Sequence, residues 1–405
     1  MLKISHFWGG IFLIAGTSIG VAMLALPVST TFMGFIPALT IFLICYVMML
    51  ISAYFFLDVN LAIKGESNLV TMAGRSLGNW GKILSWTFYL LLLYSLMAAY
   101  IAASGPLLQR AIHTVTGYAL PSFLVPFSLP ILFGGFIFLG TLGVDLINRF
   151  LMVGLAISYF LLIFFLPEHV QIDFLTHVDF TSSLVAFPIV LTSFGYHIII
   201  PSLSTYMKYD RKQLRRVLFI GSLLPLFSFL IWEFLVMGIV PMKGAVSLVD
   251  AWQKGISATE PLTQILHKPF IRLSAHFFMF FAIVTSFLGV SLSLSDFLTD
   301  GLKIKRSWQG RILAVLLTFI PPLLFVFTYE RGFIIALEYA GAFVAILLLF
   351  LPAMMAWRLK EPKFYQSKLG RLLLLVVIAF SFFLVISDLL SQWGVFKHLI
   401  FKYTQ

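Results

Sequence analysis

Runs of twenty or more mostly apolar residues recur along this 405-residue chain and constrain its fold more than any other feature. A helix needs roughly 20 such residues to cross a bilayer. Only 11% of the residues are charged, against about 25% in soluble proteins, so lipid must be the solvent. We expect an all-α polytopic membrane protein with eleven transmembrane helices, at 7–31, 35–63, 82–109, 127–147, 149–167, 183–207, 217–240, 270–298, 312–328, 333–357 and 372–395.

Lys and Arg residues are distributed unevenly between the expected loops. With the N-terminus in the cytoplasm, 19 of the 27 fall on the cytoplasmic side and 8 outside. The positive-inside rule therefore predicts a cytoplasmic N-terminus and a periplasmic C-terminus. The net charge of +11 thus reports topology, and no nucleic-acid partner is expected. We interpret the first apolar run, after Lys3, as a retained span because many equally long runs follow it.

The first span is interrupted in its middle by the sequence GTSIG, residues 16–20. Non-helical backbone at membrane depth is tolerated only where protein buries it or where it lines a watery cavity. Paired interruptions in the two halves of a chain point to a transporter's binding site. A second one lies in the sixth span, at TSFGYH, residues 192–197, with Pro201 suited to the first turn of a new half-helix.

These two breaks divide the chain into two five-span units related by inversion. The first repeat would cover 1–167 and the second 168–359, with an appended eleventh helix in 360–405, all within a single transmembrane transporter domain. In the first span, the outer half-helix would start near Gly20. Free N–H groups at its start could hold a carboxylate, and carbonyls near Ala15 and Gly16 could accept from an ammonium. The sequence alone therefore predicts a carrier for a small zwitterion, although glycines that merely permit close helix packing are the alternative.

Several stretches resemble the hydroxy/aromatic amino acid permeases of bacteria, and among them the tyrosine-specific permeases most. They are GGIFLIAGTSIGVAMLALP (9–27), YSLMAAYIAASG (94–105), GVDLINRF (143–150), LTSFGYHIIIPSLSTYM (191–207), AIVTSFLGVSLSLSDFLTDGL (282–302) and FIPPLLFVFTYERGFIIALEYAG (319–341). The resemblance implies the five-plus-five inverted-repeat fold of the amino acid–polyamine–organocation superfamily. It also implies uptake of tyrosine, or a related aromatic amino acid, across the bacterial inner membrane, driven by the proton gradient.

The expected substrate site lies between the two breaks, with the third and eighth spans forming the side-chain pocket. Its aromatic members could stack on an aromatic substrate. The candidates are Ala15, Gly16, Thr17, Ser18, Ile19, Gly20, Tyr94, Ala98, Thr192, Ser193, Phe194, Gly195, Tyr196, His197 and Ser286. For Tyr94, a lipid or packing contact is the alternative.

Four residues are candidates for ion coupling. His197 and Glu233 are ionisable groups inside expected spans, and an ionisable group within the membrane is by default a candidate functional residue. The resemblance implies H⁺ as the coupling ion. Hydroxyls at the position of Thr285 and Ser286 help to bind sodium in related carriers, so Na⁺ is the alternative. The fifth span has no lysine, which in some proton-coupled relatives substitutes for that sodium.

Other classes of protein fit the sequence less well. The histidines are scattered, and neither an HExxH motif nor a nucleotide-binding loop is present, which argues against an enzyme or an ATP-driven pump. A channel would need a repeated filter loop. We expect no cofactor and no metal. One chain suffices as the transport unit in the lipid bilayer, and a dimer is left open.

Overall fold

The computed structural model describes residues 6–63, 67–138, 141–266, 268–305, 307–329 and 331–404. Every regular element in these ranges is helical. The expectation of an all-helical polytopic membrane protein is therefore confirmed. Nine helices of the described chain are long and apolar enough to cross a membrane, or ten when the bent pair α1 and α2 counts as one span.

Most expected spans correspond to helices or to pairs of helices. α1 and α2 form the first, and α8, η5 and α9 form the sixth. The bounds are α1 His6–Ser18, α2 Val21–Thr30, α3 Phe35–Ala62, α5 Asn79–Thr116, α7 Thr141–Phe165, α8 Phe187–Thr192, η5 Tyr196–Ile199, α9 Ile200–Tyr206, α10 Arg211–Ile239, α13 Pro269–Gly301, α14 Trp308–Thr328, α15 Gly332–Val344, η6 Ala345–Phe350, α16 Leu351–Trp357 and α17 Lys368–Gln392.

The predicted boundary between the fourth and fifth spans is wrong. α6, Ser128–Phe138, is only 11 residues long, and α7 already begins at Thr141. At 1.5 Å per residue α6 extends roughly 16 Å, about half the hydrocarbon thickness. The INRF sequence at 147–150 lies inside α7. It contains neither Gly nor Pro, and a single arginine does not end a helix.

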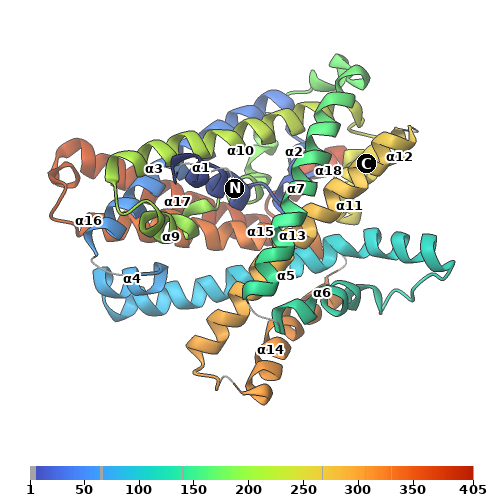
Figure 1. The fold of residues 1–405 in the computed structure, drawn as a ribbon. Helices are drawn as coiled ribbons and strands as arrows, with labels where there is room; N and C mark the ends of the chain where they lie inside the picture. Colours follow the sequence, from blue (N-terminus) through green and yellow to red (C-terminus); the bar gives the residue numbers. More distant parts are fainter. Residues whose placement is uncertain are drawn as a thin grey trace.

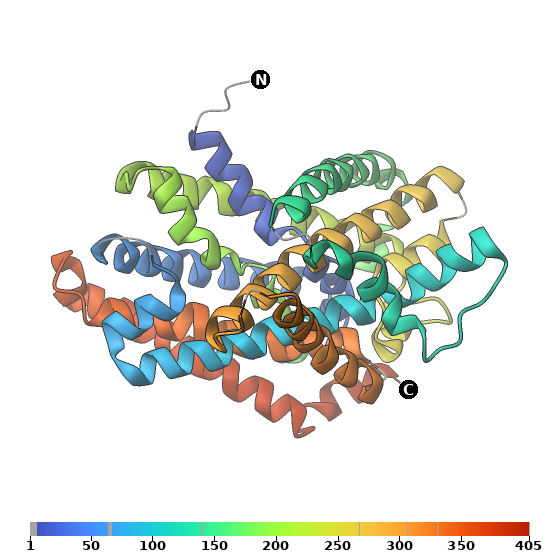
Figure 2. The ribbon, with the colours of Figure 1, turned by 60° about the horizontal axis from the view of Figure 1, so that its bottom comes forward.

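The long helices pack in matched pairs. α1 packs along α10, and α3 packs against α8 and α9. α5 lies along α15, and α7 lies along α13. Figures 1 and 2 show α3, α10 and α5 running in similar directions, with α7 and α13 crossing them. One buried apolar core joins all of these helices.

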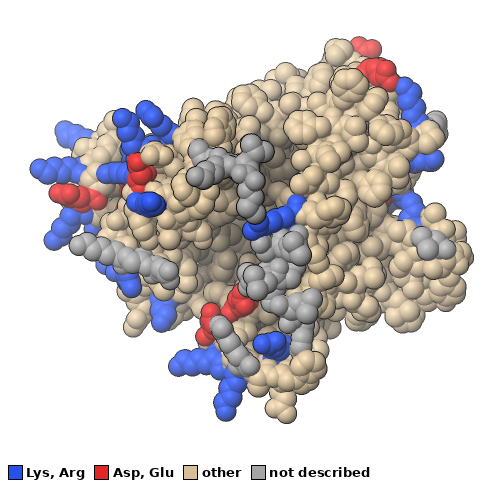
Figure 3. All heavy atoms as spheres, in the orientation of Figure 1, with Lys and Arg blue, Asp and Glu red and all other residues tan. Residues whose placement is uncertain are grey.

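The two ends of the bundle differ in charge. Lys and Arg side chains gather where α4 (Leu69–Leu77) and α16 lie and where α10 begins, at the left of Figure 3. We call this the basic end. At the opposite end, the short helices α11 (Leu248–Lys254), α12 (Thr259–Ile265) and α18 (Lys397–Thr404) lie together in Figure 1.

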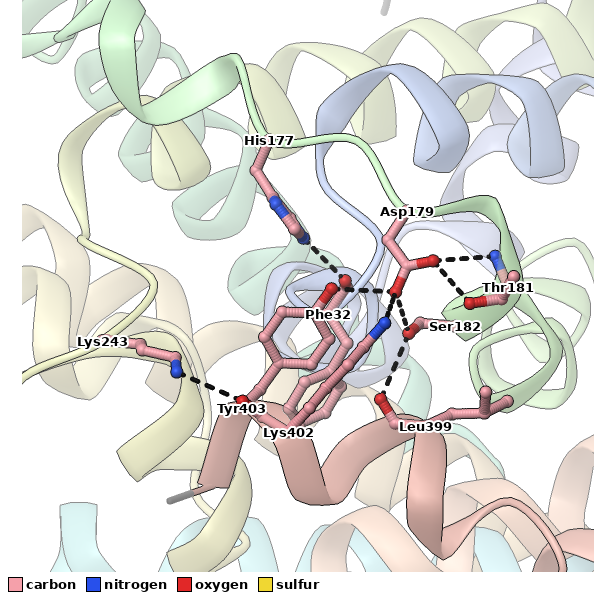
Figure 4. A network of polar contacts seen from close by, with 9 residues as sticks. All are labelled: Phe32, His177, Asp179, Thr181, Ser182, Lys243, Leu399, Lys402 and Tyr403. Atoms are coloured by element: carbon pink, nitrogen blue, oxygen red, sulfur yellow. Dashed lines mark hydrogen bonds and ion pairs between the residues drawn. The ribbon is translucent and has the colours of Figure 1, made fainter.

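A network of polar contacts fastens α18 to the opposite end of the bundle (Figure 4). Asp179 Oδ2 accepts hydrogen bonds from Lys402 Nζ at 2.7 Å and from the Tyr403 hydroxyl at 2.8 Å. The same oxygen accepts from Ser182 Oγ at 2.7 Å, and Oδ1 accepts from the backbone N–H of Thr181 at 3.0 Å. The Asp179 carboxylate thus ties α18 to the 3₁₀ helix η4, Phe180–Val185.

The same network holds the end of α2. The backbone N–H of Asp179 donates to the Met33 carbonyl at 2.8 Å, and His177 Nε2 lies 2.9 Å from the Phe32 carbonyl. The Phe32 ring packs edge-on against Trp252 of α11, at 5.1 Å between centroids, and lies 5.8 Å from the Tyr403 ring of α18. α18 therefore secures the segment that follows the first span.

The charge state of Asp179 follows from its contacts. Burial alone would raise its pKa, but hydrogen bonds from Lys402, Thr181, Ser182 and Tyr403 hold the pKa of Asp179 below its usual range. A carboxyl whose pKa is lowered by folding stabilises the fold at pH values above its ordinary pKa of about 3.9. That contribution is lost only as the pH falls further, through the folded-state value.

We predict that Asp179→Asn loosens α18, because the amide gives Lys402 and Tyr403 a weaker partner than the carboxylate does. Hydrogen exchange of 398–404 should be several-fold faster than in the wild type at neutral pH. After correction for intrinsic rates, wild-type protection should stay constant from neutral pH down to about 5, above the ordinary carboxyl pKa. Asp173→Asn, at an exposed position of η3 (Ile172–Leu175), is the matched control. Unchanged exchange in Asp179→Asn would contradict the assigned role.

Candidate substrate-binding site

A cavity of about 410 Å³ lies where the two interrupted helices meet. This volume is within the range of small-molecule sites, roughly 300–1,000 Å³. Six parts of the fold contribute, namely α1–α2, α5, α7, α8–α9, α13 and α15–η6. The lining residues are Gly16, Thr17, Ser18, Ile19, Gly20, Val21, Ala22, Tyr89, Leu92, Leu93, Leu96, Tyr100, Asn148, Met152, Thr192, Gly195, Tyr196, Ile198, Ile199, Ser202, Thr285, Ser286, Gly289, Val290, Ser293, Val344 and Leu348.

The first break is a sharp bend in the main chain. α1 ends at Ser18 and α2 begins at Val21, with axes 53° apart. Gly20 precedes α2 in extended conformation, with no side chain capping the helix. Close approach explains this glycine, because a Cβ there would lie 2.6 Å from Ser286 Oγ on α13. The backbone N–H of Val21 points to the same hydroxyl, at 3.4 Å.

α1 continues two to three residues beyond the end that the sequence predicted, whereas α2 begins next to Gly20, as expected. The N–H of Ile19 still bonds to the Ala15 carbonyl within α1, so Ala15 is not an open acceptor. The first N–H groups of a helix and its last carbonyls have no partner within it. The available donors are therefore the N–H groups of Gly20 and Ala22, since that of Val21 already donates to Ser286 Oγ, and the available acceptors are the carbonyls of Gly16 to Ser18. The positive end of the α2 dipole faces the cavity at this point.

The second break opens the facing wall of the cavity. α8 ends at Thr192, and a 3₁₀ helix, η5, follows Gly195 before α9 starts at Ile200. The predicted interruption of this span is present, and Pro201 occupies the first turn of α9 as expected. Thr192, Gly195 and Tyr196 line the cavity. Main chain from both interrupted spans thus borders one space.

The predicted site residues divide into two groups. Ten line the cavity, from both breaks and from α13: Gly16, Thr17, Ser18, Ile19, Gly20, Thr192, Gly195, Tyr196, Thr285 and Ser286. The others lie outside its lining. Ala15, Ala98, Ser193 and Phe194 are buried in the surrounding core. Tyr94 is directed elsewhere, since its hydroxyl donates to the Leu317 carbonyl of α14 at 2.9 Å.

His197 and Glu233 are both fully buried away from the cavity lining. The His197 ring stacks on Tyr196 at 5.1 Å and meets Phe56 edge-on at 6.3 Å. Glu233 of α10 accepts a hydrogen bond from the Thr30 hydroxyl at the end of α2, and its second carboxyl oxygen is unsatisfied among the described residues. Glu233 therefore contacts the outer half of the first span, whereas His197 contacts the core behind the second break.

Sequence reasoning missed an aromatic row on α5. Tyr89, Leu93, Leu96 and Tyr100 line the cavity at helical spacing. Tyr94, for which the sequence also offered a packing contact, lies on another face of the same helix and makes such a contact with α14. The helical phase of α5 could have been read from the sequence, but the face turned toward the cavity depends on how α5 packs.

A polar residue of the cavity was also missed. Asn148 of α7 lines it with a side-chain oxygen that is buried and without a partner in the described structure. Its position inside the supposed INRF turn concealed it. Ser18, which the sequence did predict, presents a similar buried hydroxyl that has no partner among the described residues.

The cavity is open toward the basic end. Ser202, Gly289 and Ser293 lie on that side and are solvent-exposed. On the opposite side, Ala103 and Leu107 of α5 are buried. The described chain therefore closes the cavity on one side and opens it on the other.

Comparison with known proteins agrees with this geometry. The Tryptophan/tyrosine permease family matches residues 3–388. The chain belongs to this family. It is therefore a multi-pass aromatic amino acid transporter and not an enzyme, as the sequence predicted. The permease is 32% identical over 403 residues to tyrosine-specific transport system 2 of Haemophilus influenzae, covering 97% of this chain and 98% of that one.

Further relatives are named either for tyrosine or for tryptophan. The permease is 34% identical to tyrosine-specific transport system 1 of Haemophilus influenzae, covering 91% of this chain and 93% of that one. It is 32% identical to the low affinity tryptophan permease of Escherichia coli, covering 94% of each chain.

We predict that Gly20→Leu abolishes transport while leaving membrane insertion intact. A side chain at this position would collide with Ser286 Oγ and fill the space at the start of α2. Substrate uptake into proteoliposomes, together with a monodisperse elution profile, checks the prediction. Gly135→Leu on α6 is the control, because a Cβ there meets nothing within 4 Å. Normal uptake by Gly20→Leu would contradict a site at this break.

Proposed function

We propose that the protein imports tyrosine across the bacterial inner membrane by proton symport with alternating access. The observation that carries this proposal is the cavity formed jointly by the two broken spans. Such paired breaks at the membrane midplane hold substrate in many secondary transporters. Tyrosine is favoured because two of the most similar relatives are named tyrosine-specific.

The main chain at the first break suits the zwitterionic part of an amino acid. The N–H groups at the start of α2 would receive the carboxylate. The carbonyls that end α1, together with Ser18 Oγ, would receive the ammonium, since that hydroxyl is buried without a partner. The attraction between the charged groups of the substrate and these main-chain dipoles is stronger than in bulk water, because protein surrounds much of the break.

The remaining wall suits an aromatic side chain. Leu93, Leu96, Val290 and Leu348 supply apolar surface, and Tyr89 offers a ring for edge or offset stacking. Aromatic substrates gain most from such a surface because they bury the largest apolar area.

The packing of the helices supports the proposed five-plus-five inverted repeat. An inversion that exchanges the first five spans with the next five pairs α5 with α13 and α7 with α15. It therefore maps the α5–α15 contact onto the α13–α7 contact, and both are among the most extensive in the fold. The α1–α10 contact likewise maps onto the contact of α3 with α8 and α9.

The proposed orientation places the basic end in the cytoplasm. The positive-inside rule then puts the N-terminus inside. With the short α6 counted as the fourth of eleven crossings, the C-terminal helix α18 lies in the periplasm. In that orientation the cavity is open inward and closed outward. A monomer would be the transport unit, because one chain forms the whole cavity.

Glu233 is the stronger proton-coupling candidate of the two buried groups. A carboxylate is costly to bury without a cation, and no ion pair to Glu233 occurs in the described part of the chain. Its contact with Thr30 links it to α2, which also forms the substrate site. The alternative is sodium coupling, through Thr285 and Ser286 beside the first break.

A broader or tryptophan-selective specificity is the second candidate function. The tryptophan permease relative covers nearly the same length at a similar identity. An indole N–H and a phenol O–H are both donors, and the unpartnered oxygen of Asn148 can accept from either.

We expect an imposed pH gradient to drive radiolabelled tyrosine into proteoliposomes without sodium. Unlabelled tyrosine should compete best, followed by tryptophan and phenylalanine, with leucine weakest because it lacks an aromatic ring. Accumulation only in sodium would establish the alternative coupling. No uptake under either gradient, from monodisperse protein, would refute the tyrosine assignment.

We predict that Glu233→Gln loses accumulation driven by the pH gradient but keeps tyrosine exchange. Glutamine retains the oxygen that accepts from Thr30 and cannot release a proton. Comparing gradient-driven uptake with counterflow in the same proteoliposomes separates coupling from binding. Glu168→Gln, at a side chain that is 59% exposed, is the matched control. Wild-type accumulation by Glu233→Gln would remove Glu233 from the coupling mechanism.

A further inference from the structure

Three side chains from distant parts of the sequence meet at the end of the bundle opposite the basic end. Arg110 lies near the end of α5, Glu260 in the first turn of α12, and His276 in α13. Arg110 Nη2 lies 2.6 Å from Glu260 Oε2, and Nη1 lies 2.8 Å from His276 Nε2. The cluster lies outside the cavity lining and plays no part in the site described above.

This cluster fixes α12 in place on the closed side of the cavity. The backbone N–H of Ala258, just before α12, donates to the Leu24 carbonyl of α2 at 3.0 Å. α11 also packs against α2, and α12 packs against α13. The α11–α12 segment therefore connects the outer half of the first span to α5 and α13. Any opening on this side must move α2 away from α5, and the Arg110 contacts oppose that movement.

The carboxylate of Glu260 makes the ion pair strong. Its side chain is only 4% exposed, while that of Arg110 is 43% exposed. Its second oxygen, Oε1, has no hydrogen-bond partner in the described chain. A buried carboxylate that loses its cation is left uncompensated, which is strongly unfavourable. Arg110 therefore keeps α12 closed for as long as it remains in this position.

The protonation state of His276 determines whether Arg110 can stay there. A guanidinium carries five donors, no acceptor and a permanent charge, so His276 Nε2 must accept and the ring must be neutral. A second proton on the ring would remove this acceptor and place two cations 2.8 Å apart. Histidine is the side chain that changes charge between pH 5 and 8.

The charged surroundings of His276 are few. Arg110 on α5 and Glu260 on α12 face the ring, and Arg272 lies one turn away on α13. Lys268, at the start of α13, is paired with Glu168 at 2.5 Å. Among the described residues, one carboxylate, that of Glu260, therefore faces two fixed guanidinium groups, and a third cation at His276 would exceed that negative charge.

We propose that Arg110, Glu260 and His276 form a proton-sensitive latch on the outer closure of the transporter. Neutral His276 holds Arg110 on Glu260, and a proton arriving at Nε2 displaces Arg110 and releases α12. The assignment of this side as the outside rests on the proposed function. The latch makes outward opening respond to external protons, whereas Glu233 lies within the bundle.

The test uses a cysteine reporter at Ala258, which is fully buried in the closed state. The native Cys45 is also fully buried and contributes little background. Ala258→Cys is labelled from outside with a membrane-impermeant maleimide, at external pH values between about 5 and 8. The same reporter is labelled in the His276→Gln background, where the amide oxygen can accept from Arg110 at every pH.

We divide the labelling of Ala258→Cys by that of the same reporter carrying His276→Gln. When the external pH is lowered, this ratio should rise roughly fivefold or more, which is the lower end of the range for allosteric coupling. The ratio cancels the lower reactivity of the thiol itself at acid pH. Arg110→Gln should label strongly at every pH, because the ion pair is gone. Elution profiles of all variants verify folding.

Two results would overturn the latch. One is a ratio that does not change with pH. The other is that, at neutral pH, Ala258→Cys is labelled equally with and without Arg110→Gln. The assay contains no amino acid, so its outcome is separate from the proposed function. Failure of tyrosine uptake with pH-dependent labelling rejects the substrate, and normal uptake with flat labelling rejects the latch.

Discussion

The break between Ser18 and Val21 is the constraint on which the rest of the structure depends. In lipid, every backbone group must find a partner, so an interrupted helix has to be enclosed by protein or face water. Here α13 supplies the Ser286 hydroxyl beside Gly20, and the second broken span supplies the facing wall. The helices around the break are arranged to shield it, and the cavity is the space they leave.

α2, the second half of the first span, is held at several independent points. Thr30 bonds to Glu233 of α10, and the Leu24 carbonyl accepts from the Ala258 N–H. Beyond the helix, the Met33 carbonyl accepts from the Asp179 N–H, and α18 secures that segment in turn. Only ten residues long, α2 is thus connected to a membrane helix, to the α11–α12 segment and to the chain's last helix. A change at any of these points can be transmitted to the substrate site, because a short rigid helix moves as a unit.

The sequence predicted the features that depend on local chemistry, which are the spans and their breaks. It did not predict every side chain that faces the cavity, because that depends on how the helices pack. Apolar runs, glycines and Pro201 act locally, so the spans and both breaks were found, the first with an error of two to three residues at the end of α1. The turn at INRF was wrong because a charged residue was taken for a helix end, and this concealed Asn148. The choice of Tyr94 over Tyr89 and Tyr100 failed for another reason. All three belong to α5, and only the contacts with α13 and α15 decide which face meets the cavity. His197 stands out in the sequence as a histidine beside a break, yet the 3₁₀ turn of η5 directs it into the core.

The positions of the two ionisable clusters suggest why this fold separates binding from gating. Apart from its apolar wall, the cavity is lined by hydroxyls, phenols, an amide and main chain, and its described lining includes no Asp, Glu, Lys, Arg or His. A zwitterion bound there meets dipoles rather than fixed charges, so binding adds no net charge to the interior. Glu233 and the Arg110 cluster contact α2 or the segment attached to it, outside the cavity. Under the proposed function, protonation at either place would act on the position of α2, and through that helix on the N–H groups that would hold the substrate carboxylate.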